Sequence, residues 1–307
     1  MGSPEQPIEN RGHTAEGSMS KIIQQLEDSP AGKYGLLGPS LLIIGLFLVV
    51  PSLLLLRLSV SPFAGGSIGA GFTLEHYVRT LTEYQSTIFR TVKIALIVTV
   101  IDFLIGYPLA YAAVRGGKWQ GRLIVVATLA PLSVDVVVRT FGWFLLLQDG
   151  GLVPLILSFV FPEDAIPSLM YNELGIIIGL THVLLPFMVF PLINILHTIP
   201  PSLEEAGRDL GASQVGVFRK VLLPLSLPGI AAGTLMVFSI AMASYVTPSL
   251  LGGTNRVMAT TITNTFLNSA NWPFGSAMAV FLLLVGLLVI FGYQWSLNKI
   301  DSSSGGL

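Results

Sequence analysis

The sequence contains no cysteine and few charged side chains. Without Cys, the 307-residue chain cannot form disulfides, thiolate nucleophiles or Cys-based metal sites. Lys, Arg, Asp and Glu make up 11% of the residues and hydrophobic residues 52%, whereas ordinary soluble domains carry about 25% charged residues. The formal net charge of −1 gives no basic surface for nucleic acid. This composition predicts a membrane protein, because so few charges cannot cover one soluble core.

Motifs of an enzyme are missing as well. No G-x-x-x-x-G-K-[ST] string occurs, and the glycine-rich stretch Gly65–Gly71 lacks the lysine of a phosphate-binding loop, so it is typical of a flexible turn. No Ser-His-Asp or H-E-x-x-H arrangement is present. His182 stands alone in an apolar stretch, a position typical of a hydrogen bond between helices. We therefore expect no catalytic residue, no metal and no cofactor in this chain.

What the sequence does contain is six long apolar stretches with few charges. A helix needs about 20 such residues to cross a hydrocarbon core about 30 Å thick. The pattern predicts an all-α membrane protein with six transmembrane helices, and it disfavours buried helices of a soluble protein. The stretches are Leu36–Leu56, Thr91–Val114, Leu123–Leu147, Leu174–Leu196, Gly229–Leu251 and Phe274–Tyr293.

The spans divide the chain into a tail, a membrane domain and a second tail. Residues 1–35 form the N-terminal tail, residues 36–293 the six-helix domain and residues 294–307 the C-terminal tail. Met1–Ser18 is rich in Gly, Pro, Ser and Glu, which predicts disorder. Met19–Asp28 has the pattern of a short amphipathic helix on the membrane surface.

Lys and Arg residues predict the orientation. With six spans, both termini and two of the loops lie on one side, and this side holds ten of the 16 Lys and Arg residues. The short loop Arg115–Arg122 belongs to it and is rich in bases. Because short basic loops stay in the cytoplasm, we expect both termini there, together with the charged loop at residues 200–224.

That charged loop contains residues that typically start and end two short helices. Ser202 and Glu205 have the spacing of a capping box, which predicts a helix over Leu203–Leu210. Gly211 follows at the position where a left-handed residue ends a helix. Ser213 can cap a second helix over Gln214–Leu223, which Pro224 would end, and one face of this helix would be apolar. The expected apolar face consists of Val215, Phe218 and Leu222. A loop in which the start and end of each helix are so clearly marked predicts a rigid docking surface.

The loop resembles the EAA loop of binding-protein-dependent ABC importer permeases. The family pattern is Glu-Ala-Ala, three residues, Gly, nine residues, Ile, any residue and Leu-Pro. Here Gly207 replaces the second Ala and Val221 replaces Ile, both small changes in volume. The resemblance implies that this loop is the coupling helix, set into a groove of a cytoplasmic ATPase. The implied coupling residues are Glu205, Ala206, Gly207, Gly211, Ala212, Ser213, Phe218 and Pro224.

Further fragments resemble the spermidine/putrescine branch of these permeases, in order from about Leu36 to Tyr293. They are FTLEHYV (Phe72–Val78), GYPLAYA (Gly106–Ala112), VRTFGW (Val138–Trp143), PFMVFPL (Pro186–Leu192) and TPSLLGG (Thr247–Gly253). The resemblance implies a subunit that translocates a polyamine or another small polar solute. Members of this branch often carry an acid near the last fragment, and MASYVTPSLLGG has none. Iron, thiamine, phosphonates and organic acids therefore stay open as substrates, and so does an ATP-independent channel or secondary transporter.

The same resemblance implies partners and a place in the cell. It implies a type I ABC importer in the bacterial inner membrane, with a second, related permease and two ATPase subunits. ATP and Mg²⁺ would be bound by those ATPases. An extracytoplasmic solute-binding protein would deliver the solute, and no nucleic acid is involved.

Polar residues inside the spans are candidates for the solute pathway. A charge at the bilayer centre costs roughly 2.5–3.5 kcal/mol, so each needs a compensating partner. Asp135 and Arg139 stand four residues apart and can pair with each other or with a neighbour. Asp102 has no base three or four residues away, which makes it the better candidate for lining the path. The full set of candidates is Asp102, Asp135, Arg139, His182, Ser244 and Tyr245.

Overall fold

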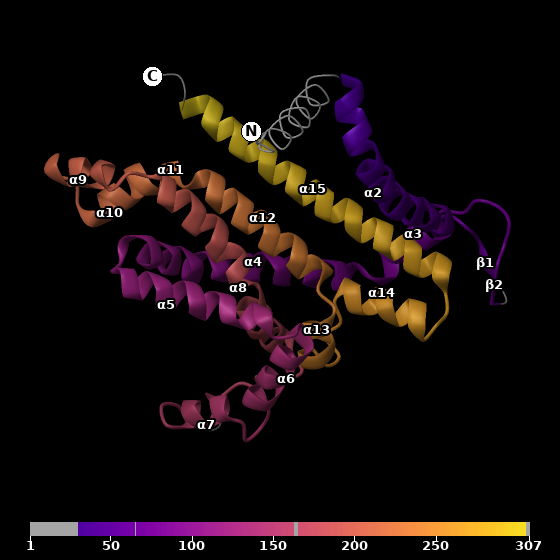
Figure 1. The fold of residues 1–307 in the computed structure, drawn as a ribbon. Coiled ribbons are helices and arrows are strands. Elements are labelled where there is room, and N and C mark those ends of the chain that lie inside the picture. The colour runs from indigo at the N-terminus through magenta and orange to yellow at the C-terminus, as the bar shows by residue number, and fades with distance from the viewer. Residues whose placement is uncertain (1–29, 65, 163–164, 305–307) are drawn as a thin grey trace, which may run out of the picture. The chain divides into compact units, whose positions relative to one another are not determined.

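The computed structural model describes residues 30–64, 66–162 and 165–304, which are mostly helical. The disorder expected for Met1–Ser18 and the helix expected for Met19–Asp28 lie outside the described residues. The chain divides into two compact units, residues 1–57 and 58–307. The elements are α2 (Pro30–Ser59), β1 (Phe63–Ala64), β2 (Ser67–Ile68), α3 (Glu75–Glu83), α4 (Gln85–Arg115), α5 (Lys118–Leu129), η1 (Ala130–Ser133), α6 (Val136–Leu147), α7 (Leu152–Ser158), α8 (Glu173–Thr198), α9 (Pro201–Asp209), α10 (Gln214–Val217), the π-helical turn η3 (Phe218–Leu222), α11 (Leu223–Leu225), α12 (Leu227–Ala243), α13 (Val246–Leu251), α14 (Met258–Leu267) and α15 (Trp272–Ser304) (Figure 1).

Four of the six expected spans lie within single helices, namely α2, α4, α8 and α15. Helix α15 continues to Ser304, past the expected end of the last span. By length and composition, four stretches of the described residues could cross a membrane, or five if one bent pair of helices counts as a single span. The four are Leu42–Ser59, Val136–Ser158, Glu173–Thr198 and Trp272–Trp295, and the bent pair is Gln214–Leu225 with Leu227–Ala243.

The third and fifth expected spans are interrupted. Helix α5 ends at Leu129, a 3₁₀ turn containing Pro131 follows, and α6 begins at Val136. Asp135 caps α6, because its carboxylate accepts a hydrogen bond from the backbone N–H of Val137 at 2.8 Å. In the fifth span, α12 ends at Ala243 and α13 starts three residues later. Short apolar helices joined by a cap read in sequence like one continuous stretch.

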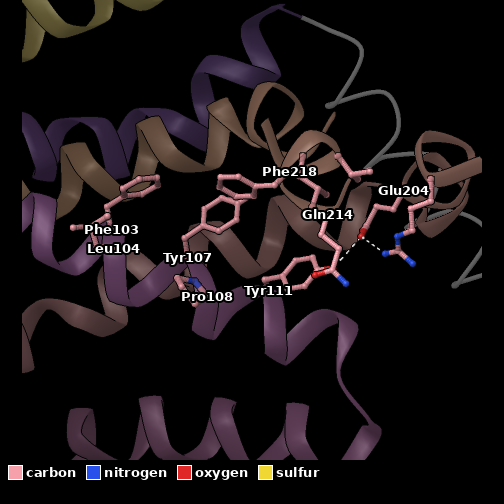
Figure 2. A pocket seen from close by; sticks show the side chains of 11 residues that line it. Phe103, Leu104, Tyr107, Pro108, Tyr111, Glu204, Gln214 and Phe218 are labelled. Carbon is pink, nitrogen blue, oxygen red and sulfur yellow. Dashed lines mark hydrogen bonds and ion pairs between the residues drawn. The ribbon is translucent and has the colours of Figure 1, made fainter. Parts of the chain in front are cut away.

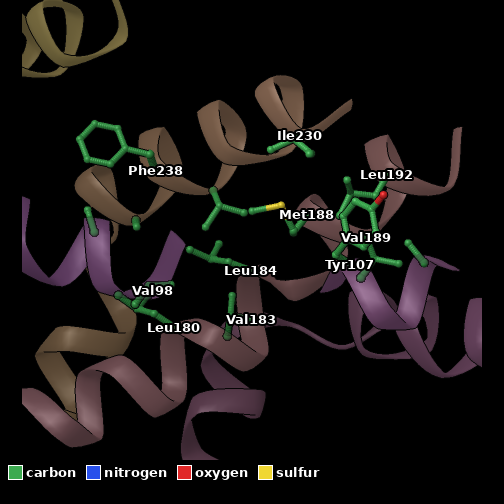
Figure 3. Packing of buried hydrophobic residues seen from close by; sticks show 14 of the residues in the cluster. Val98, Tyr107, Leu180, Val183, Leu184, Met188, Val189, Leu192, Ile230 and Phe238 are labelled. Carbon is green, nitrogen blue, oxygen red and sulfur yellow. The ribbon is translucent and has the colours of Figure 1, made fainter. Parts of the chain in front are cut away.

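The core of the second unit is formed by α4, α8 and α12, which pack against one another. Figure 3 shows Leu184 and Met188 of α8 among side chains of the other two helices, including Val98 and Phe238. Leu184, Met188 and Val98 are almost completely buried. Three long helices that bury apolar faces on each other form a continuous core.

Glycines let these helices approach closely. Gly229 and Gly233 on α12 form a G-x-x-x-G pair, a spacing that favours close packing of membrane helices. A Cβ atom at Gly229 would lie 2.8 Å from the carbonyl oxygen of Pro191 on α8, and one at Gly233 would lie 3.2 Å from that of Met188. The two helices are therefore in contact through their backbones.

The end of the bundle near Glu173 is joined by ion pairs and hydrogen bonds. Glu173, at the start of α8, pairs with Arg90 at 3.1 Å and Lys93 at 2.5 Å, both on α4. The hydroxyl of Thr91 accepts a hydrogen bond from the backbone N–H of Met258 at 2.9 Å, which ties α4 to α14. Helix α4 is thus attached to two neighbours at its N-terminal end.

Candidate functional site

The charged loop, residues 200–224, forms two short helices, α9 and α10, that contact each other (Figure 1). We call it the coupling loop. The capping box expected for Ser202 and Glu205 was wrong. Helix α9 starts at Pro201, with Pro200 as its N-cap and no side-chain capping bond. Proline at the first helical position has its φ angle already set and needs no N–H partner, so the helix starts before Ser202.

The turn after α9 confirms the role predicted for Gly211. This residue has φ +82°, in the left-handed region. Its N–H donates to the carbonyl oxygen of Arg208 at 2.8 Å, and the N–H of Ala212 donates to the carbonyl oxygen of Gly207 at 3.1 Å. These two bonds form the Schellman motif, which needs a residue that tolerates positive φ. The path of the chain out of α9 is therefore set by one glycine.

The second helix begins as expected and ends differently. Ser213 caps α10, since its hydroxyl accepts from the N–H of Gly216 at 3.2 Å. Pro224 does not end the helix, contrary to the prediction. It is the second residue of α11, which continues directly from the π-helical turn, and the helical run ends one residue later, where the chain bends by 70° between Leu225 and Leu227.

The apolar face of the second helix also differs from the expected one. Of the three residues expected on one apolar face, Phe218 is half-buried and Leu222 is buried. Val215 is 64% exposed, and Val217 is buried in its place. The π-helical turn over residues 218–222 shifts the register of this helix by part of a turn, so a regular 3.6-residue period does not predict the buried face.

The main feature that sequence reasoning missed is Glu204. Its side chain is 4% exposed, whereas the neighbouring Glu205 is exposed. Its carboxylate accepts a hydrogen bond from the Nε of Arg115 at 2.6 Å and one from the hydroxyl of Tyr111 at 2.9 Å. Arg208 lies one turn further along α9, 3.5 Å from the same carboxylate. The adjacent pair Glu204–Glu205 indicated this difference in burial. Neighbouring residues of a helix point about 100° apart, so only one of these two acids can face the bundle.

A cavity lies between α4 and the coupling loop. Figure 2 shows Tyr107, Tyr111 and Phe218 around it and Glu204 at one end. Its volume is about 460 Å³. The rings of Tyr107 and Phe218 meet edge to face with centroids 5.2 Å apart, and the Tyr107 hydroxyl is 3.0 Å from the hydroxyl of Ser226. The C-terminal half of α4 thus contacts both ends of the coupling loop.

Asp102, the first candidate for the solute pathway, is buried in the middle of α4. Its side chain is fully covered, and neither carboxylate oxygen has a hydrogen-bond partner among the described residues. The neighbouring Phe103 and Leu104 line the cavity beside the coupling loop, and Asp102 is not among the lining residues. Its role in the pathway stays a prediction.

Asp135, Arg139 and His182 occupy different environments. Asp135 is exposed and serves as the cap of α6, and no ion pair joins it to Arg139 among the described residues. Two nitrogen atoms of Arg139 and the Nδ1 atom of His182 are buried without hydrogen-bond partners in the described part of the chain. The His182 ring packs edge-on against Trp143, with centroids 5.6 Å apart. It also lines a cavity of about 320 Å³.

Ser244 and Tyr245 lie in the break between α12 and α13. Ser244 is the C-cap of α12, and Tyr245 is exposed. Tyr245 lines an apolar cavity of about 440 Å³ and a polar one of about 270 Å³. The structure therefore does not gather the six pathway candidates into one site.

Comparison with known proteins agrees with this architecture. The family described as "Binding-protein-dependent transport system inner membrane component" matches residues 36–302. The spermidine/putrescine transport system permease protein PotB of Haemophilus influenzae is 33% identical over 257 residues, covering 83% of this chain and 90% of that protein. PotB of Escherichia coli K12 is 32% identical over 260 residues, covering 83% and 94%.

Two solved structures share the fold. A bacterial ABC transporter that imports the acidic polysaccharide alginate has a TM-score of 0.68 at 16% identity, covering 92% of this chain and 99% of its own. An alginate ABC transporter in complex with a periplasmic protein bound to alginate pentasaccharide has a TM-score of 0.66 at 16% identity, with 87% and 94% covered. These likenesses concern the fold alone, and they confirm the predicted all-α bundle. By its sequence over residues 36–302, the chain belongs to the family of binding-protein-dependent transport system inner membrane components.

Proposed function

We propose that this permease imports a polyamine or a related small amine. In this proposal it works with a second, related permease, two ATPase subunits that bind ATP and Mg²⁺, and an extracytoplasmic solute-binding protein. The PotB relatives are named for spermidine and putrescine, which supports the solute. A structural neighbour was solved with its periplasmic protein, which supports the delivery partner.

The observation that carries the partnership with an ATPase is the exposed surface of the coupling loop. Leu203, Leu210 and Val215 are 43%, 89% and 64% exposed. Apolar side chains on a charged loop, next to an exposed Glu205, form a surface suited to a protein groove. The Schellman turn at Gly211 holds α9 against α10, so the loop can dock as one body.

Transport would then follow from movement of this loop. When ATP binding closes the two ATPases, the coupling loops of both permeases are drawn together, and the bundle changes from inward-facing to outward-facing. The binding protein, docked on the other side, releases its solute at that step. The chain itself supplies the path and the docking surface, and it carries out no covalent chemistry.

Reconstitution tests the proposal. We expect the chain to co-purify with an ATPase, and we expect proteoliposomes holding the full complex to take up labelled spermidine or putrescine only with ATP and the binding protein. Uptake by the chain without an ATPase would instead indicate a channel or a secondary transporter.

A specific observation favours a second candidate solute. The polar cavity of about 270 Å³ is lined by Arg256, Asn264, Asn268 and several hydroxyl groups, and none of its lining residues is acidic. A guanidinium beside amides and hydroxyls suits an anionic or uncharged polar solute better than a polyamine. If an organic acid or phosphonate is taken up in the same assay and a polyamine is not, this second candidate replaces the first.

Asp102 gives a sharper test of a cationic solute. We expect Asp102→Asn to lower uptake of a polyamine at least about five-fold. Losing about 1 kcal/mol of interaction free energy between this side chain and the solute corresponds to that factor. An acid buried inside a span needs a compensating partner, and no described residue gives Asp102 a hydrogen bond. The amide keeps the shape of the side chain, so assembly should survive.

The control is Asp149→Asn, the same change at an exposed turn. Uptake and ATP hydrolysis are measured on the same proteoliposomes. Unchanged polyamine uptake in Asp102→Asn would make Asp102 a packing residue, and equal losses of uptake and hydrolysis would indicate damaged assembly.

The orientation is a further part of the proposal. We expect a cysteine at Gly117 to react with a membrane-impermeant thiol reagent only from the cytoplasmic side, and cysteines at Gly66 and Asn268 only from outside. The Cys-free chain supplies a clean background. The physical reason is the excess of Lys and Arg around Gly117, and reversed labelling would overturn the assigned orientation.

A further inference from the structure

We infer that the buried pair Glu204–Arg115, together with Tyr111, is the link through which the coupling loop moves α4. Glu204 and Arg115 are positioning residues in this inference, because they touch neither ATP nor solute. The inference rests on the proposed docking of the coupling loop on an ATPase. Without this link, movement of the loop would not be passed to α4 as one rigid step.

The ion pair between Glu204 and Arg115 is short and largely buried. The Glu204 side chain is 4% exposed and that of Arg115 is 16% exposed, with 2.6 Å between Nε and Oε1. Arg115 also donates from Nη2 to the carbonyl oxygen of Ile199 at 2.7 Å, just before α9. Two donors of one guanidinium thus hold both the acid of the loop and the backbone just before the loop. Such charge-assisted bonds are shorter and stronger than neutral ones.

Tyr111 adds a second point of attachment one turn earlier on α4. Its hydroxyl donates to Oε2 of Glu204 at 2.9 Å, so both carboxylate oxygens are bound from α4. Tyr107, one turn earlier again, contacts Phe218 near the other end of the loop and Ser226 just after it. Three side chains spaced four residues apart on one face of α4 therefore contact Glu204 and Phe218 of the coupling loop.

Helix α4 can carry this movement across the bundle. It has 31 residues, about 46 Å at 1.5 Å per residue. At its other end Arg90 and Lys93 hold Glu173 of α8, and Thr91 holds the N–H of Met258 on α14. A displacement at Arg115 therefore reaches two helices at the far end. At each end of α4, basic side chains of this helix bind an acid on a neighbouring element, Glu173 at one end and Glu204 at the other.

The test measures solute molecules taken up per ATP hydrolysed in the reconstituted complex. We expect Glu204→Gln and Arg115→Met each to lower this ratio at least about five-fold, the size of a typical coupling between sites. Tyr111→Phe, which removes one hydrogen bond and keeps the ring, should give a smaller loss. Combining Glu204→Arg with Arg115→Glu should restore part of the ratio that each single change removes.

The matched control is Glu83→Gln on α3. Glu83 pairs with the Nε of Arg79 at 2.8 Å, but both side chains are about half exposed and the pair lies within one helix. The ratio should not change in this variant. An unchanged ratio in Glu204→Gln would overturn the inference. So would parallel losses of uptake, hydrolysis and membrane-inserted protein, because a merely structural role predicts that pattern.

A distance measurement tests the movement directly. Ala112 on α4 and Asp209 on α9 are exposed and can carry a pair of spin labels in the Cys-free chain. We expect one narrow distance distribution, unchanged by ATP, and a broad or nucleotide-dependent one after Glu204→Gln. A nucleotide-dependent distance in the unchanged background would show that α4 and α9 move separately. If the labelled but otherwise unchanged complex shows no ATP-dependent uptake, the proposed function is wrong and not this link.

Discussion

Replacing Gly211 with valine is expected to lower solute uptake at least about ten-fold while the protein remains in the membrane. Gly211 has φ +82°, and a left-handed residue with a Cβ costs roughly 1–2 kcal/mol, more when it is β-branched. A free-energy change of about 1.4 kcal/mol corresponds to a ten-fold change in an equilibrium constant, such as that for docking of the coupling loop on an ATPase. This strain is too small to unfold the packed helices, but it redirects the chain between α9 and α10.

The matched control is Gly211→Asn. Asparagine tolerates the left-handed region better than any other residue except glycine, so this variant should keep most of the uptake. Both variants are measured in proteoliposomes with the ATPase and the binding protein, and co-purification of the ATPase is scored separately. Equal uptake by the valine and asparagine variants would mean that the turn is not needed for coupling.

Replacing Gly229 with leucine is expected to prevent assembly of the bundle. A Cβ atom there would lie 2.3 Å from the Cγ2 atom of Ile195 and 2.8 Å from the carbonyl oxygen of Pro191. The isoleucine could turn away, but the backbone oxygen could not. Overpacking of a core typically costs about 1–3 kcal/mol, and a backbone clash that separates α12 from α8 should reach or exceed the upper end of this range.

The measurements are the amount of full-length protein in the membrane and its Tm in detergent. Gly142→Leu on α6 is the control, because no atom lies within 4 Å of a Cβ placed there. The control should accumulate and melt like the unchanged protein. Normal accumulation and Tm for Gly229→Leu would show that α12 and α8 are not packed through their backbones.

Local signals predicted two features of the coupling loop correctly. The left-handed glycine after α9 and the serine cap of α10 were both found, because each is decided by one or two residues of backbone. The start of α9 and the role of Pro224 were predicted wrongly. Pro201 is compatible with a first helical turn, where its missing N–H is harmless, whereas Pro224 lies one residue before a continuous helical run ends. A proline therefore marks a boundary without saying on which side the helix lies.

The pathway candidates show that a local sequence pattern does not predict the surroundings of a buried charge. Asp102 and Arg139 were chosen because charges in apolar stretches are costly, and that argument identifies expensive residues without locating their surroundings. In the structure Asp102 is buried in the core and Asp135 is an exposed helix cap. Whether a costly residue faces a path, a partner subunit or its own core depends on which helices meet there.

By itself, the sequence determined that this is a helical membrane protein, where its apolar stretches lie and where the charged loop between two of them turns. Composition, stretch length and the spacing of Glu205, Gly211 and Pro224 are properties of short segments, so no tertiary information is needed to read them. The tertiary structure alone decided that Glu204 faces inward and Glu205 outward. That choice depends on Arg115 and Tyr111, which lie about 90 residues earlier in the chain. A buried carboxylate is stable only where its partners are already in place, and only the tertiary structure brings Glu204 to the C-terminal end of α4.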